Sequence, residues 1–222
     1  ILETHLYGVD LDPQAAEIAT VNLIMRAMAD RRATSRRLPL ILNQNVKVGN
    51  SLIGAGPDDP FYADHSDDLA ELRRLRLALA AEEHSPEHDA GFALVDETAR
   101  RLNAGLDARL AEHFADVAIH RPFNWAVEFP EVFLDEQGRH RGEAAGFDVV
   151  VGNPPWEVVK PDLREFYAQF DPDIESRMTR RKVERRIVEL NAEDPRREAA
   201  WQVQKARIEE AAAYYRATDD YT

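Results

Sequence analysis

The tetrapeptide Asn153-Pro154-Pro155-Trp156 combines residue types that can do chemistry together. Two successive prolines between an asparagine and a large aromatic residue are uncommon, since proline makes up only about 5 % of residues in average proteins. A structural explanation exists, because X-Pro-Pro forms a stiff, extended turn that can end a strand. That explanation gives the tryptophan no task, whereas a chemical explanation uses every residue of the tetrapeptide.

Activation of an exocyclic amino group, on a base or an amide, is the chemistry that these residues suit. The nitrogen of such a group is a poor nucleophile because its lone pair is delocalised. If the Asn153 side-chain carbonyl and the Pro154 backbone carbonyl each accept one of its N–H groups, the nitrogen becomes more tetrahedral and its lone pair becomes available. The two prolines would hold these acceptors rigid. Trp156 offers a flat face for stacking, worth about 1–3 kcal/mol for a nucleobase.

The composition agrees with chemistry that needs neither a thiol nor a metal. The chain has no cysteine, which excludes a disulfide framework, a thiolate nucleophile and a cysteine-based zinc site. The histidines show no metal-ligand spacing, so we expect no metal site and place them on the surface. The histidines in question are His84, His88, His113, His120 and His140.

The acidic balance of the chain restricts how it can bind nucleic acid. With 28 Lys and Arg against 41 Asp and Glu, the formal net charge is −13, so any contact with phosphates must be local. One candidate is a basic cluster on an expected helix, and the alternative is a solvated helix face paired with Glu175, Glu184 and Glu189. Residues 31–37 hold a second Arg-rich patch with the same alternatives. The basic cluster consists of Arg177, Arg180, Arg181, Lys182, Arg185 and Arg186.

Three strands are expected to position the polar residues. A β-rich segment ends at Asp10, a second ends at Asn50, and the continuous apolar run Phe147–Gly152 leads into Asn153. The order strand, helix, strand predicts a parallel α/β sheet. Because ligands bind at the carboxyl edge of such sheets, these three polar residues are expected to meet in one crevice.

Asp10 and Asn50 have plausible ligand roles at that edge. An acid directly after a strand can accept two hydrogen bonds from the diol of a ribose, and the alternative is that Asp10 only stabilises a turn. The Asn50 amide can bond the edge of a purine, with a simple Asx-turn as the alternative. Both alternatives stay open at the level of the sequence.

The remaining sequence is predicted to be mostly helical. Asp12 and Pro13 are typical of the N-cap and first position of a helix that runs to about Ala29. Leucine-rich segments within residues 54–120 predict a pair of amphipathic helices, joined by a loop over Glu82–Asp89. The expected organisation is a first part of an α/β core at 1–53, a helical insertion at 54–120, a second part of the core with the Asn-Pro-Pro-Trp loop at 121–160, and a charged helical extension at 161–222.

The segment Gly152–Trp156, behind Phe147–Val151, resembles the catalytic motif of amino-group DNA methyltransferases. Together with Phe129–Phe133 and Tyr7–Pro13, it is similar to the large adenine-N6 methylases of restriction-modification and phage-defence systems, in the Eco57I-like and PglX-like group. The resemblance implies a Rossmann-like class I methyltransferase sheet, here partial, with a helical insertion and a helical C-terminal extension. It also implies S-adenosylmethionine as the cofactor.

The resemblance also implies roles for individual residues. Asp10 would bind the ribose of S-adenosylmethionine, Leu11 would pack against its adenine, and Asn50 would bond the adenine amino group. In the catalytic loop, Asn153, Pro154, Pro155 and Trp156 would activate and stack on a flipped-out adenine. The base must leave the duplex because its amino group is inaccessible in the stack.

The sequence departs from this family in lacking its glycine-rich first motif. We therefore expect a fragment that binds S-adenosylmethionine weakly or not at all by itself and is inactive in isolation. Its expected partners are double-stranded DNA and the rest of the same polypeptide, with the first motif, a target-recognition domain and a possible nuclease. No apolar run reaches the roughly 18 residues of a membrane span and no signal peptide is evident, so we expect a cytoplasmic location without membrane contact.

Two other functions remain as alternatives. Related Asn-Pro-Pro-aromatic loops serve enzymes that methylate a protein glutamine amide or a guanine amino group in RNA. The chain can also be a non-catalytic, methylase-like DNA-recognition module of a defence complex.

Overall fold

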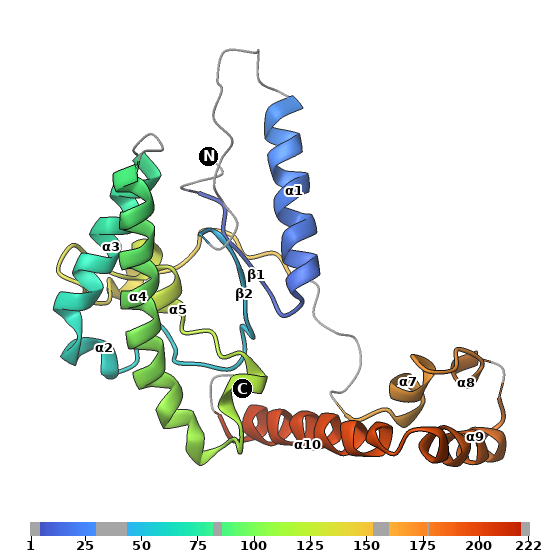
Figure 1. Cartoon of the computed structure of the whole chain (residues 1–222). Coiled ribbons are helices and arrows are strands. Elements are labelled where there is room, and N and C mark those ends of the chain that lie inside the picture. The colour runs from blue at the N-terminus through green and yellow to red at the C-terminus, as the bar shows by residue number, and fades with distance from the viewer. Residues whose placement is uncertain (1–4, 30–43, 82–85, 153–159, 177, 219–222) are drawn as a thin grey trace. The chain divides into compact units, whose positions relative to one another are not determined.

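A computed structural model describes residues 5–29, 44–81, 86–152, 160–176 and 178–218 of the 222-residue chain (Figure 1). The chain divides into two compact units, Ile1–Val151 and Gly152–Thr222. The expected site residues Asn153, Pro154, Pro155, Trp156 and Arg177, and the Arg-rich patch at residues 31–37, lie outside the described residues.

The first unit contains a parallel pair of short strands. Strand β1 (Gly8–Asp10) pairs with β2 (Val46–Val48) in a register that sets Gly8 opposite Val46 and Asp10 opposite Val48. Helix α1 (Pro13–Ala29) connects them and packs on both strands. The parallel strand, helix, strand order predicted from the sequence is therefore confirmed, with shorter strands than expected.

Helix α1 starts as its sequence predicts and is apolar on two sides. The Asp12 Oδ1 atom accepts the Gln14 N–H at 2.8 Å, which makes Asp12 the N-cap and Pro13 the first helical residue. Ala16 is buried against Val46 of β2. A second apolar row remains exposed, because nothing in the described residues covers it. This row is Ile18, Val21, Met25 and Met28, each more than half exposed.

Two long helices lie side by side on the other side of the strand pair (Figure 1). After the short helix α2 (Phe61–Asp64), α3 (Ser66–Ala81) packs along α4 (Pro86–Arg109), followed by two 3₁₀ turns, Leu110–Glu112 and Val117–His120. The predicted helical pair is confirmed. The loop between them is shorter than the expected Glu82–Asp89, because α4 already begins at Pro86. Proline suits the first turn of a helix, since its ring fixes φ near the helical value.

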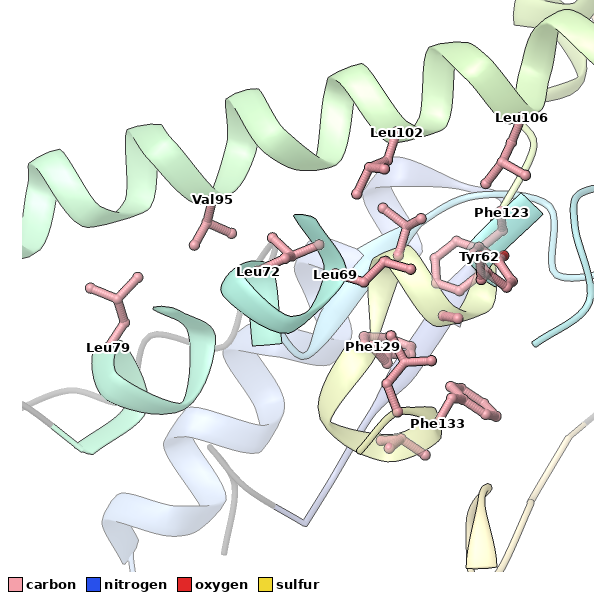
Figure 2. Close-up of a cluster of buried hydrophobic side chains, with 14 residues drawn as sticks. Tyr62, Leu69, Leu72, Leu79, Val95, Leu102, Leu106, Phe123, Phe129 and Phe133 are labelled. Atoms are coloured by element: carbon pink, nitrogen blue, oxygen red, sulfur yellow. The ribbon is translucent and has the colours of Figure 1, made fainter. Parts of the chain in front are cut away.

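The core of this unit lies between the two long helices and two short ones, α5 (Trp125–Glu128) and α6 (Pro130–Phe133). Figure 2 shows Leu102 and Leu106 of α4 facing this core from one side, with Phe129 and Phe133 on the other. Leu72 and Leu102 are at most 1 % exposed. The aromatic rings contact one another mostly edge to face, as their charge distribution favours.

The strand expected over Phe147–Gly152 is absent. Phe147 packs on the aromatic core, but Val149, Val150 and Val151 are 77 %, 80 % and 92 % exposed and belong to no strand. The sequence prediction was wrong here, because an apolar run becomes a strand only when a neighbouring strand accepts its backbone hydrogen bonds. We call these three residues the valine run.

The second unit is helical and built around a small core. It contains α7 (Leu163–Ala168), α8 (Asp173–Ser176), α9 (Arg180–Glu193) and α10 (Arg196–Ala217). Asp162 caps α7 by accepting the Arg164 and Glu165 N–H groups. Tyr167 is fully buried, and its hydroxyl lies 3.0 Å from the Asn191 Oδ1 atom and 3.1 Å from Glu198 Oε2. As a whole the described chain is an α/β protein that is mostly helical, with one two-stranded parallel sheet.

Candidate functional site

Strand β1 ends at Asp10, and Leu11 follows it in the loop after β1; both residues are exposed. One oxygen of Asp10, Oδ1, accepts the Asp12 N–H at 2.8 Å, so this carboxylate does stabilise the turn. Because Asp12 caps the helix independently, Asp10 is not needed as the cap. Leu11 places an apolar side chain, 53 % exposed, directly beside this carboxylate.

The loop after β2 lies beside the loop after β1. The Gly49 N–H donates to the Asp10 carbonyl at 2.9 Å, which joins the two strand ends. The Asn50 Oδ1 atom accepts the Leu52 N–H at 3.1 Å, the Asx-turn that the sequence left as an alternative. The structure thus brings Asp10, Leu11 and Asn50 to one edge of the sheet, where both polar side chains also serve their turns. Asn153, the third polar residue expected at this edge, lies outside the described residues.

The segment that follows the second 3₁₀ turn holds the loop after β2 in place. The Arg121 carbonyl accepts the Asn50 N–H at 2.7 Å, and the Phe123 N–H donates to the Ile53 carbonyl at 2.7 Å. The Trp125 Nε1–H donates to the Ser51 carbonyl at 3.2 Å. These bonds tie residues about 70 positions apart in the sequence, so the helical insertion between them contributes to the shape of the candidate site.

Two glycines allow this close approach. A Cβ added at Gly49 would lie 2.6 Å from the Phe123 Cδ2 atom, and one added at Gly54 would lie 2.4 Å from the Phe123 carbonyl oxygen. Gly54 also has φ +146°, which side chains rarely adopt. The glycines around Asn50 therefore admit the Phe123 segment, a requirement that the sequence analysis missed.

Arg121 is a second residue that the sequence analysis missed. Its backbone is left-handed, with φ 49° and ψ 61°, and it is the sole non-glycine residue with positive φ in the described ranges. Its Nη1 donates to the Leu11 carbonyl at 2.9 Å. No sequence signal marks an arginine for this conformation, because Asn, Asp and Gly are the residues that favour it.

Glu131 of the Phe129–Phe133 motif forms a buried ion pair. The Arg76 guanidinium donates through Nε at 2.9 Å and Nη2 at 2.7 Å to its two carboxylate oxygens, and both side chains are at most 10 % exposed. Burial raises the pKa of Glu131, but the charge and hydrogen bonds of Arg76 outweigh burial and hold that pKa below its ordinary value. This motif residue therefore joins α3 to α6.

A second buried pair joins β2 to α5. Lys47 Nζ donates to Glu128 at 2.5 Å, and Asn103 of α4 donates to the other oxygen of the same carboxylate at 2.7 Å. Burial lowers the pKa of Lys47, whereas Glu128 opposes that shift. The pair borders a cavity of about 490 Å³ that is also lined by Asp96, Arg100 and Asp107. The cavity lies between β2 and α4, and Val48 at the end of β2 is part of its lining.

Helix α9 separates its basic residues into paired and unpaired ones. Arg186 donates to Asp171, Glu189 and Glu193. This residue is therefore paired with acidic side chains, the alternative to DNA contact that the sequence left open. Arg180 pairs with Glu184 at 3.1 Å but is itself 92 % exposed. Within the described parts of the chain, no acidic partner contacts the exposed side chains of Arg181, Lys182 and Arg185.

The histidines and acids do not assemble a metal site in the described residues, where no group of three such side chains could hold an ion. One histidine prediction was wrong: His120 is 3 % exposed and packs on Phe114, with ring centroids 4.1 Å apart. His113 and His140 are exposed, as expected.

The strand-end residues fit the nucleoside part of S-adenosylmethionine. An exposed carboxylate lies at the end of β1, with an exposed apolar side chain beside it and an asparagine on the adjacent loop. A ribose diol needs acceptors and a purine needs an apolar face, so the donor and acceptor types match this group.

Comparison with protein families identifies one match. The model of the Eco57I restriction-modification methylase family matches residues 4–177 of the chain. Searches of curated proteins and of solved structures found no match. None of the helices in the described ranges has the length and apolar character that crossing a membrane requires.

Proposed function

We propose, from the premise that this chain belongs to the Eco57I restriction-modification methylase family, that it transfers a methyl group from S-adenosylmethionine to the N6 amino group of adenine in duplex DNA. The family supplies the coarser statement, a DNA methyltransferase of restriction-modification. One observation supports the cofactor part of the finer statement: Asp10, Leu11 and Asn50 meet at the carboxyl edge of a parallel sheet. The adenine acceptor rests on the residue types of Asn153–Trp156.

The chain's own residues would divide the work between the ends of β1 and β2, which would hold the cofactor, and the Asn153–Trp156 loop, which would hold the target amine. Asp10 would hold the ribose hydroxyls, Leu11 would cover one face of the cofactor adenine, and Asn50 would bond its edge. When bound, S-adenosylmethionine supplies an electrophilic methyl group. Asn153 and Pro154 would accept the two N–H groups of the target amine, so that its lone pair points along the line of attack.

The same loop would hold the target base. Pro155 keeps the loop rigid, and Trp156 stacks on the flipped adenine. The proton that the amine loses on methylation passes to solvent or to an acceptor at the loop. The tetrapeptide lies outside the described residues, so these roles rest on its residue types alone.

Double-stranded DNA would meet the chain at α9. Arg181, Lys182 and Arg185 are exposed and have no acidic partner in the described ranges, so their charges are available to phosphates. With a net charge of −13, the chain needs such a local surface to approach DNA at all. Further parts of the same polypeptide would supply target recognition.

The larger sheet of class I methyltransferases is part of the proposal. The exposed apolar row of α1 and the valine run support it, because contiguous apolar side chains that are 51–92 % exposed mark surfaces that another part of a protein covers. The observed two strands would then be one part of a broader parallel sheet.

The test measures methyl transfer by the full-length enzyme. Duplex DNA is incubated with S-adenosylmethionine and its nucleosides are analysed by mass spectrometry, where N6-methyladenine is expected. Asn153→Ala should lower kcat by at least about 100-fold, as loss of a preorganised acceptor does, with little change in DNA affinity. Methylation that persists in this variant contradicts the role of Asn153.

Two results would favour the alternatives. A methyl group found on protein glutamine or on RNA guanine, and not on DNA, would replace the proposed acceptor. DNA binding that neither needs the cofactor nor leads to any methyl transfer would favour a recognition module.

A further inference from the structure

We propose that Arg121 is a positioning residue of the cofactor site, which fixes the separation between the loop after β1 and the loop after β2. This inference rests on the proposed function and deepens it, because it concerns what keeps the same site in shape. Arg121 would not touch the reacting atoms. It would act through the backbones of Leu11 and Asn50.

Two hydrogen bonds connect Arg121 to both loops. Its guanidinium Nη1 donates to the Leu11 carbonyl at 2.9 Å, across 110 positions of sequence. Its own carbonyl accepts the Asn50 N–H at 2.7 Å. A single residue therefore contacts the backbones of Leu11 and Asn50, the two residues proposed to hold the cofactor adenine.

The backbone of Arg121 supports a functional role independently of these bonds. A left-handed backbone costs free energy for a non-glycine residue, so it persists only where several surrounding contacts hold it in place. Such residues cluster at functional sites. Here the Arg121 N–H donates to the Ala118 carbonyl at 3.1 Å, and Pro122 forms a parallel bridge with Asn50. This turn is what allows the carbonyl of Arg121 to reach Asn50 while its side chain reaches Leu11.

The two loops differ in how strongly they depend on Arg121. The loop after β2 keeps its bonds to Phe123 and Trp125 when the guanidinium is removed. The loop after β1 retains the Gly49 to Asp10 bond at the strand ends, but it loses the support at Leu11 further along. Removal of the guanidinium should therefore loosen one wall of the site without unfolding the unit.

The central experiment uses Arg121→Gly in the full-length enzyme. Glycine adopts the left-handed backbone readily, so this variant removes only the side chain. Calorimetry with S-adenosylhomocysteine, which has no methyl group to transfer, should show about tenfold weaker binding, the loss expected for one charge-assisted hydrogen bond. The KM for S-adenosylmethionine should rise by the same factor with kcat within about twofold, since the lost binding is equal in ground and transition states.

Two further variants separate positioning from a general structural effect. Arg121→Lys keeps a cationic donor and should recover part of the lost affinity. Arg141→Ala is the matched control, because Arg141 also donates to a backbone carbonyl, that of Val132 at 3.4 Å, and lines a pocket with Tyr7, which precedes β1, rather than with Asp10 or Asn50. This control should bind S-adenosylhomocysteine like the wild type, and all variants should keep the wild-type Tm within a few degrees.

Asp10→Ala makes the outcomes distinguishable. If Asp10→Ala weakens binding while Arg121→Gly stays within twofold of the wild type, the inference about Arg121 is overturned and the proposed function stands. If the wild-type enzyme neither binds S-adenosylhomocysteine nor forms N6-methyladenine, the proposed function itself fails, and if Asp10→Ala leaves binding unchanged, the cofactor site at the strand ends fails. An Arg121→Lys variant that binds no better than Arg121→Gly, or an Arg141→Ala variant as weak as Arg121→Gly, also contradicts the inference.

Discussion

The core between α3, α4, α5 and α6 and the exposed apolar residues of the same unit differ in how completely they are covered. In the core, Leu72 and Leu102 are at most 1 % exposed, and the charges of Arg76 and Glu131 are paired. On α1, by contrast, Ile18 is 63 % exposed, and the valine run reaches 92 % exposure at Val151. Both regions have apolar side chains, yet only one of them buries these side chains.

The buried side chains stabilise this unit, whereas the exposed apolar side chains are available for contacts outside it. Strand β2 lies between the two regions: Val46, which is buried, packs on Ala16 of α1, whereas Lys47 pairs with Glu128 of α5. Substitutions in the core should therefore be costly, and equivalent substitutions among the exposed apolar residues should be nearly neutral. Each prediction below tests one side of this contrast.

The largest effect is expected for Glu131→Gln. The change leaves the Arg76 charge buried without its partner, which typically costs about 3–5 kcal/mol of the free energy of unfolding. Urea denaturation of the variant measures this loss. Glu71→Gln is the matched control: its partner Arg74 is 64 % exposed, so the loss should stay below about 1 kcal/mol. Equal losses in the two variants would contradict the contrast.

Truncation of a core leucine should follow. Leu102→Ala removes a side chain that is 1 % exposed and should cost about 2–5 kcal/mol, including the cavity that remains. Ile18→Ala removes a similar side chain from the exposed row of α1 and should change the free energy of unfolding by at most about 0.5 kcal/mol. A large loss for Ile18→Ala would mean that α1 is covered in the isolated chain.

Acid should weaken the core through its carboxylates. The pKa values of Glu128 and Glu131 are lowered: burial raises them, but Lys47 and Arg76 respectively outweigh burial. A lowered pKa in the folded state gives stability that is complete above the unfolded value, near 4.5, and is lost as the pH falls through the folded value. The fall of Tm below pH 4.5 should therefore be shallower in Glu131→Gln than in the wild type. Parallel curves would show that the pair does not titrate as described.

The smallest effect is expected at the valine run. Val150 is 80 % exposed, so Val150→Thr should change the free energy of unfolding by no more than about 0.5 kcal/mol. Thermal unfolding of the same chain provides the measurement. If Val150→Thr lowered the free energy of unfolding by more than about 1 kcal/mol, Val150 would have to be packed against other residues rather than exposed.

Local patterns predicted the local structure well. Asp12 and Pro13 marked the start of α1, and the leucine spacing marked α3 and α4, because caps and helical periodicity act within a few residues. The parallel order of β1 and β2 followed from the helix between them, and with it the meeting of Asp10 and Asn50. The roles of Asn153, Pro154 and Trp156 remain predictions.

Contacts between distant segments were not predictable in the same way. The ion pair of Arg76 and Glu131 spans 55 positions, and nothing in either local sequence names the partner. Phe147–Gly152 had the composition of a buried strand, but no neighbouring strand in the described part of the chain accepts its hydrogen bonds. His120, expected on the surface, is buried because Phe114 packs on its ring.

The sequence by itself determined where α1 begins, that two strands run parallel, and which residue types end those strands, since each depends on neighbouring residues. Only the tertiary structure decided that Phe123 requires Gly49 and Gly54, and that Arg121 reaches both loops of the candidate site. Such requirements arise when folding brings backbone segments that are distant in sequence within hydrogen-bonding distance. The local sequence of either segment does not indicate which partner it will meet.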